Sequence, residues 1–245
     1  MKNKLHNQRG NVFIYILIAI ALLAALSYAV SRGSRSSGSA LTGEQARIAA
    51  QEIIDYGNDI ATAVQKLTLR GCSDTEISFD SAVLAGYSNV SSPTDESCNV
   101  FSENGGRLNV QEFSESFFET SHSAYNAYGE VYFSNTIQVE NIGTTCGTAD
   151  CTDLLFQLPH IRSEICEAIN VNVIDDKILP DESVTNHSYQ TITKFIGAYT
   201  FQTPGTTSTI GDDSFPAGRV NGCIHRFDGG GFGTPYTYFQ VLIAR

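Results

Sequence analysis

Six cysteines are the side chains with the clearest chemistry in this 245-residue sequence, because an even set of thiols can oxidise to disulfides. None of them forms a C-x-x-C pair, so neither a redox motif nor a zinc ribbon is indicated. The sequence alone does not choose among the connectivities that six cysteines allow. Proximity along the chain favours three bridges: Cys72–Cys98, Cys146–Cys151 and Cys166–Cys223. The alternative is a metal site of three thiolates, Cys146, Cys151 and Cys166, but an oxidising compartment favours bridges.

Patterns for enzyme chemistry are weak. The sequence has no G-x-S-x-G, no H-E-x-x-H, no P-loop and no G-x-G-x-x-G that opens a helix. His160 and Glu164 stand four residues apart on an expected helix, where a metal site is conceivable, but we interpret them as a solvated polar pair. His225 and Asp228 could form an acid–base pair only with a distant serine. We therefore expect no catalytic residues, no metal and no cofactor.

The composition is typical of a folded, exported protein. With 42% hydrophobic residues, the chain has enough apolar content for one sizeable domain or two small ones. The formal net charge is −11, and because Lys2, Lys4 and Arg9 lie in the first ten residues, residues 11–245 carry −14. A body this acidic repels phosphate backbones, which argues against nucleic-acid binding as the main activity.

The N-terminal segment predicts a helix of membrane length. A short basic leader precedes an uncharged run of 19 residues from Val12 to Val30. As a helix this run is roughly 28 Å long, close to the roughly 30 Å thickness of a bilayer core. The apolar region of a secretory signal is usually only about 7–15 residues long, so the length favours an anchor that is retained.

The arrangement Gln8-Arg9-Gly10-Asn11, followed at once by the apolar run, resembles the leader of type IV pilins and type II secretion pseudopilins. In that family a membrane peptidase cuts after the leader glycine and methylates the new N-terminus, and the apolar helix is kept. The resemblance implies cleavage after Gly10, methylation of Asn11 and assembly with other pilin-like subunits. It also implies that Cys166–Cys223 corresponds to the disulfide that frames the variable region of many type IV pilins.

The sequence departs from the family at two positions. Asn11 stands where the family usually has Phe, and Tyr15 stands where it usually has Glu. That Glu offsets the positive amine of a neighbouring subunit in apolar surroundings, where an unpaired charge is costly. A phenol is neutral near pH 7 and cannot replace it. A tip subunit has no neighbour above it, so we expect a minor or tip-located subunit.

Ordinary signal-peptide processing is the competing interpretation. Ser27-Tyr28-Ala29 has small residues at the two positions that matter for signal cleavage. A cut after Ala29 would give a secreted or membrane-tethered periplasmic or extracellular binding domain. A chain cut after Ala29 would lack the apolar helix and could not polymerise through it.

A second helix is expected from Gly43 to Leu69. Apolar or small residues recur at alternating steps of four and three, which produces a single stripe along one face. Thr42 is the expected N-cap, Gln45 completes a capping box, and Gly71 is the expected stop. The stripe consists of Ala46, Ala50, Ile53, Gly57, Ile60, Val64 and Leu67. We expect this face to pack on the sheet of its own domain.

The remaining segments predict an α+β fold. Strands are expected over 77–85, within 129–143, and over 191–202, 222–226 and 236–244, where β-branched and aromatic residues gather. Helices are expected over 110–121 and over 153–170, the second entered near Pro159. The expected architecture is a long N-terminal hydrophobic and amphipathic helix followed by a mostly antiparallel β head with a short additional helix, stabilised by disulfides.

Five parts follow from these patterns: a leader (1–10), a transmembrane and assembly helix (11–30), a Ser/Gly linker (31–43), an amphipathic helix (44–70) and an α+β head (71–245). The expected function is that of a non-catalytic subunit in a type IV pilus-like or type II secretion-like filament. The expected partners are other pilin-like subunits, the prepilin peptidase and, before assembly, the inner membrane, with no nucleic acid. The head would lie in the periplasm and later on an extracellular filament.

Overall fold

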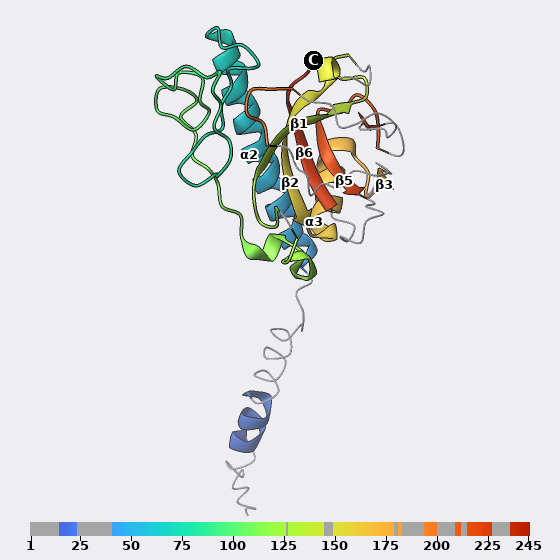
Figure 1. The fold of residues 1–245 in the computed structure, drawn as a ribbon. Helices are drawn as coiled ribbons and strands as arrows, with labels where there is room; N and C mark the ends of the chain where they lie inside the picture. The colour runs from blue at the N-terminus through green and yellow to red at the C-terminus, as the bar shows by residue number, and fades with distance from the viewer. Residues whose placement is uncertain are drawn as a thin grey trace, which may run out of the picture. The chain divides into compact units, whose positions relative to one another are not determined.

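The computed structural model describes residues 15–23, 41–125, 127–144, 149–178, 181–182, 194–199, 209–211, 215–226 and 236–245. The chain divides into two units, Met1–Ala40 and Leu41–Arg245. In the first unit, residues 15–23 form a helix. We call the second unit, Leu41–Arg245, the folded unit. It combines helices with one sheet, which confirms the α+β class (Figure 1).

The folded unit begins with helix α2 (Gly43–Leu69), and its strands come later in the chain. After α2 the chain forms η1 (Glu115–Phe117), η2 (Thr120–His122), β1 (Tyr132–Val139), η3 (Ala149–Cys151), β2 (Asp153–Ile161), α3 (Ser163–Ile174), β3 (Asp181–Glu182), β4 (Thr209–Ile210), β5 (Asn221–Arg226) and β6 (Tyr236–Ile243). The helices labelled η are single 3₁₀ turns.

The sheet has the strand order β3-β5-β6-β2-β1-β4. Its central pairings, β5 with β6, β6 with β2 and β2 with β1, are antiparallel. The two short edge strands are parallel to their neighbours, β4 to β1 and β3 to β5. The sheet is therefore mixed: the expected antiparallel pairing holds in its centre, and both edge strands are parallel to their neighbours. The last strand, β6, lies between β5 and β2, so the end of the chain is built into the middle of the sheet (Figure 1).

Helix α2 has the predicted bounds and both predicted ends. The Gln45 N–H donates to Thr42 Oγ1 (3.3 Å), and the Thr42 N–H donates to Gln45 Oε1 (3.0 Å), which is the reciprocal capping box. Gly71 follows the helix with φ +101°, in the left-handed region that glycine adopts without strain. The apolar stripe is buried as expected, and Ile53, Ile60 and Leu67 have no exposed surface.

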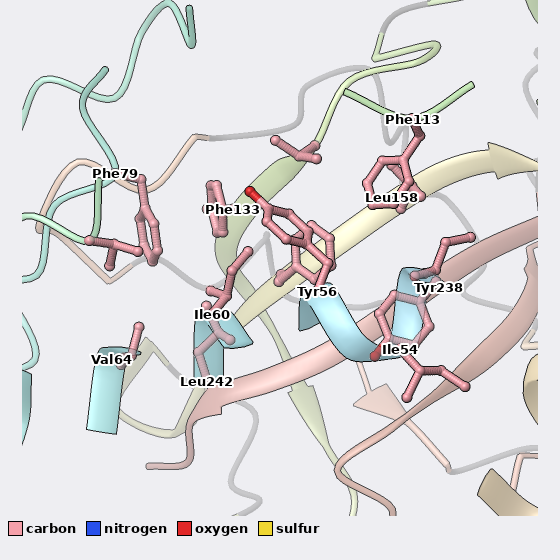
Figure 2. Packing of buried hydrophobic residues seen from close by; sticks show 14 of the residues in the cluster. Ile54, Tyr56, Ile60, Val64, Phe79, Phe113, Phe133, Leu158, Tyr238 and Leu242 are labelled. Atoms are coloured by element: carbon pink, nitrogen blue, oxygen red, sulfur yellow. The ribbon is translucent and has the colours of Figure 1, made fainter. Parts of the chain in front are cut away.

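Helix α2 packs closely on the sheet at Gly57. A Cβ at this position would lie 2.6 Å from Tyr238 Oη and 3.1 Å from Tyr238 Cε1, so no side chain fits there without movement. Around this contact, Ile54 and Ile60 of α2 share a buried apolar cluster with Leu158 and Leu242 of the sheet (Figure 2). The glycine in the stripe is thus the point where a strand side chain reaches the helix backbone.

The sheet has an apolar cluster on each face. Successive strand residues point to opposite faces, so β2 contributes Leu154, Phe156 and Leu158 to the cluster under α2 and Leu155 to the other. The second cluster consists of Ile137, Val139, Leu155, Ile210, Phe215, Ile224, Phe239 and Val241. Helix α3 lies on the α2 side, because Ile165 and Ile169 belong to the α2 cluster.

The predicted helix over 153–170 is wrong in its first part. Residues 153–161 form β2, and the helix, α3, begins only at Ser163. All nine residues of β2 are buried, so the strand lacks the alternation of a half-exposed strand and resembles a buried helix in sequence. Pro159 does not open a helix. It lies where the register between β2 and β6 is irregular, a position that tolerates a missing N–H.

Two further secondary-structure predictions are not matched, and a third lies partly outside the described residues. Residues 77–85 form only an isolated bridge between Ser78 and Asn99, and the loop is held by side-chain amides: Asn89 Nδ2 donates to the Thr75 and Ile77 carbonyls (2.8 and 2.7 Å). The predicted helix over 110–121 is reduced to the single turns η1 and η2. Of 191–202, only residues 194–199 are described, and they form a bridge rather than a strand.

Candidate functional site

The helix at residues 15–23 is apolar on every side and exposed in this chain. Tyr15 is 72% exposed, Leu17 65% and Leu22 66%. The other large side chains of the segment, Ile16, Ile18, Ile20 and Leu23, are also exposed by half or more. Among the residues that the structure describes, no helix is both long enough and apolar enough to cross a membrane.

The predicted processing positions lie outside the described residues. Gly10 and Asn11 belong to this group, as do the competing signal site Ser27-Tyr28-Ala29 and residues 31–40 of the linker. Cleavage, N-methylation and the full extent of helix 11–30 therefore stay predictions.

Two of the three predicted disulfides are present. Cys72, just after α2, is bonded to Cys98, with Cα atoms 5.8 Å apart. Cys166 of α3 is bonded to Cys223 of β5, with Cα atoms 5.3 Å apart and the two residues 57 positions apart in sequence. The first bridge fixes the loop that follows α2, and the second fixes α3 to the sheet. The three-thiolate metal interpretation is wrong, because Cys166 is bonded to Cys223.

The third predicted bridge is described at one end only. Cys151 is disulfide-bonded, and Cys146 lies outside the described residues. The Cys146–Cys151 pairing therefore stays a prediction. No free cysteine is found in the part of the chain that the structure describes.

Asn170 supports the Cys166–Cys223 bridge from one helical turn away, a role that the sequence did not suggest. Its Nδ2 donates to the Cys223 carbonyl (2.7 Å) and to the Ile178 carbonyl (2.8 Å), and its Oδ1 accepts from the Cys223 N–H (2.9 Å). The side chain is completely buried and uses both ends of its amide. The amide pairs with the backbone of Cys223 as a neighbouring strand would, and so it positions β5 against α3.

The residues considered for catalysis do not converge. His160 is on β2 and Glu164 is in the first turn of α3, so the expected helical pair does not exist. His225 lies on β5 against the Tyr236 ring, with ring centroids 4.6 Å apart, and Asp228 lies outside the described residues. The described residues hold no group of three or more His, Cys, Asp or Glu side chains arranged for a metal ion.

A groove of about 440 Å³ lies between the first turns of α2 and the outer side of α3. Charged side chains of both signs line it: Glu44, Arg47, Glu164, Glu167 and Lys177. Mixed charges of this kind select no single class of ligand, so the groove does not define a binding site.

A buried carboxylate joins three distant parts of the folded unit. Asp153 accepts from the Val139 N–H (2.7 Å) and from the Arg245 N–H (3.0 Å). The Arg245 side chain continues to Asp74 (Nε to Oδ2, 3.1 Å) and lies over the Tyr199 ring, 3.9 Å from its centroid. Burial raises the pKa of Asp153 to about 6, against the lowering effect of the two N–H donors and of Arg245. The cluster is structural, and it makes stability depend on pH.

Comparison of the chain with protein-family models, with curated proteins and with solved structures finds no match. The exposed apolar helix and the disulfide-bonded folded unit are therefore the features on which a functional proposal must rest.

Proposed function

We propose that this chain is a non-catalytic, pilin-like subunit of a type IV pilus-like or type II secretion-like filament. Before assembly, residues 11–30 anchor it in the inner membrane, with the remainder in the periplasm. After assembly the same helix packs among the helices of other pilin-like subunits, and the folded unit lies on the extracellular filament. The observation that carries the proposal is the exposed, all-round apolar helix at residues 15–23.

The free energy available from burying the apolar side chains of this helix supports a partner outside the chain. Six Ile and Leu side chains are half or more exposed between Ile16 and Leu23. Complete burial of one such side chain contributes about 1.5–3 kcal/mol, so burying all six contributes on the order of 10 kcal/mol. A helix that is apolar all round is typical of a membrane or of a helical core. Lipid before assembly and neighbouring helices afterwards would supply that burial.

The folded unit supports the proposal of a pilin-like domain outside the cytoplasm. Its first helix, α2, lies along the sheet and buries an unbroken apolar stripe, the arrangement expected for the second half of a pilin-type first helix. The disulfides Cys72–Cys98 and Cys166–Cys223 suit an oxidising compartment outside the cytoplasm. Neither feature supplies a catalytic group.

Tyr15 favours a minor or tip-located subunit. It occupies the fifth position after the proposed cut, and segment 11–30 contains no carboxylate that could neutralise a neighbour's N-terminal amine. Burying that amine alone in an apolar bundle is expensive. Counting copies in purified filaments by quantitative mass spectrometry tests this point, and we expect far fewer copies than of the main subunit.

N-terminal sequencing of the chain from expressing cells that contain a prepilin peptidase tests the main proposal. We expect a mature chain that starts at a methylated Asn11 and retains residues 12–30. Gly10→Val should block the cut because this peptidase family requires a small residue there, whereas Gly33→Val, in the linker, should not. A mature chain that starts at Val30 would overturn the filament proposal in favour of a secreted or tethered binding domain.

A further inference from the structure

The geometry points to a two-histidine site for a divalent transition-metal ion of the zinc class, formed by His122 and His160. The Nδ1 atoms of the two rings face each other at 3.4 Å, although the residues are 38 positions apart in sequence. His122 ends the 3₁₀ turn η2, and His160 is near the end of β2.

The distance between the two nitrogens fits a shared ion better than a direct hydrogen bond. Nitrogen donors usually lie about 2.7–3.2 Å from their acceptors, so 3.4 Å is long for such a bond. Zinc binds imidazole nitrogen at about 2.0–2.1 Å in tetrahedral geometry. Two ligands of such an ion are then about 3.4 Å apart. Imidazole nitrogen also suits copper and nickel, whereas calcium and magnesium prefer oxygen.

The backbone aims His160 at this position. His160 has φ +62°, in the left-handed region that is rare for a residue with a side chain and more so inside a strand. The register between β2 and β6 shifts between Leu158 and Ile161, so His160 lies in a bulge. Bulges redirect side chains, and backbone strain of this kind often accompanies functional positions.

A short backbone ladder holds His122 beside the bulge. The Glu119 N–H donates to the His160 carbonyl (2.9 Å), and the Arg162 N–H donates to the Phe117 carbonyl (2.9 Å). Phe118 and Ile161 form the antiparallel bridge between these bonds. Because 117–119 is paired with 160–162, η2 directly follows a fixed strand-like segment, and the imidazole of His122 is placed by the backbone.

Aromatic rings and one carboxylate lie around the two imidazoles. The Tyr125 ring lies nearly parallel to that of His160 (centroids 5.9 Å apart), and Tyr128 closes another side at 6.1 Å. Burial lowers the pKa of His122, with the charge of Glu119 opposing that effect. The Glu119 carboxylate would also offset part of the charge of a bound cation.

The site is open on one side. His160 is 6% exposed, whereas His122, Tyr125 and Tyr128 are only partly buried, so an ion could enter past His122. Because the described residues hold no third His, Cys, Asp or Glu in a metal-binding arrangement, the other coordination positions would be taken by water. With two protein ligands, we expect micromolar affinity and a role in fixing the 117–122 segment to the end of β2.

Zinc titration of the full-length chain, purified in mild detergent after chelator treatment, tests the inference. At pH 7.5 we expect one ion per chain by calorimetry and a rise in Tm of at least about 5 °C at saturating zinc. His122→Ala should weaken binding at least about tenfold, because one of two protein ligands is lost. Lowering the pH to 5.5 should also weaken binding, because the ligands must be neutral.

His225→Ala is the matched control, since His225 packs on Tyr236 of the neighbouring strand, and it should bind zinc like the wild type. Zinc binding that is absent in the wild type, or unchanged in His122→Ala, overturns the inference. Should His122→Ala fail to fold, X-ray absorption of the zinc-loaded wild type decides. Two imidazole ligands are expected, and any other count contradicts the site.

Discussion

The helix at residues 15–23 and helix α2 are built from the same kinds of apolar residue, but their surroundings differ. In α2 the apolar residues form one stripe, and Ile53, Ile60 and Leu67 are completely buried against the sheet. In residues 15–23 they occupy every side and are half or more exposed. An apolar stripe can be satisfied by the chain's own sheet, whereas an all-round apolar surface requires lipid or other helices. The same hydrophobic driving force therefore folds one segment onto its sheet and leaves the other with an exposed apolar surface.

Among the changes that leave the unit folded, the largest expected effect is at the long-range disulfide. Replacing both Cys166 and Cys223 with Ala should lower the free energy of unfolding by about 4 kcal/mol, because the bridge closes a long loop in the unfolded chain. The double replacement at Cys72 and Cys98 should cost about 3.5 kcal/mol, because that loop is shorter. Denaturant unfolding of the full chain in detergent measures both losses. A larger loss at Cys72 and Cys98 would contradict the dependence on loop length.

A charged residue placed in each helix distinguishes a segment needed for membrane insertion from one needed for the stability of the folded unit. Ile18→Arg should reduce membrane insertion by about 3 kcal/mol, measured as the membrane-bound fraction after alkaline extraction of cells, and should leave the Tm of the folded unit unchanged. Ile60→Arg, at a position with no exposed surface, should unfold that unit and leave insertion intact. Ile18→Leu is the conservative control. If Ile18→Arg lowers the Tm of the folded unit, the two helices are not independent.

Sequence patterns predicted the local features of the fold well. Helix α2 has the expected bounds because its stripe, capping box and stop glycine all act within a few residues of one another. Strands β1, β5 and β6 lie within or close to the expected ranges, and both described disulfides join the cysteines that proximity favoured.

The features that were missed depend on contacts between distant segments. β2 is buried on both faces, which removes the alternation that identifies a strand. The loop after Cys72 is ordered by Asn89 and Asn99 side chains rather than by a strand, and a propensity for strands cannot reveal that. His122 and His160 meet only because segment 117–119 pairs with the end of β2. Nothing in the local sequence of either histidine predicts this meeting.

The pH dependence of stability should differ between the wild type and Asp153→Asn. In the folded chain the pKa of Asp153 is about 6, above the ordinary value of 3.8, so the folded state binds more protons than the unfolded state between these limits. The contribution of Asp153 to stability therefore falls as pH rises from about 4 to about 6, by about 2 kcal/mol. Unfolding both proteins at a series of pH values measures this contribution as the free energy of unfolding of the wild type minus that of the variant. A difference that grows with pH would contradict the raised pKa.

The smallest expected effect concerns the close contact between Gly57 of α2 and Tyr238 of β6. Gly57→Ala places a methyl group 2.6 Å from Tyr238 Oη, and overpacking of this kind costs about 1–3 kcal/mol. Alanine is also the better helix former by about 1 kcal/mol, so we expect a net loss of about 1 kcal/mol. Gly43→Ala is the matched control in the same helix, because a Cβ there meets no atom within 4 Å. Thermal unfolding of both variants measures the difference.

Tyr238→Phe separates the steric contact from any other effect of the methyl group. In the wild type this change removes the bond from Tyr238 Oη to Gln240 Oε1 (3.1 Å) and should destabilise. In the Gly57→Ala background it also removes the closest clash, so it should cost less there or become favourable. A double-mutant cycle gives the coupling between the two positions. Zero coupling would mean that the distance between α2 and β6 is not set at Gly57, and that the helix can shift along the sheet to accept the methyl group.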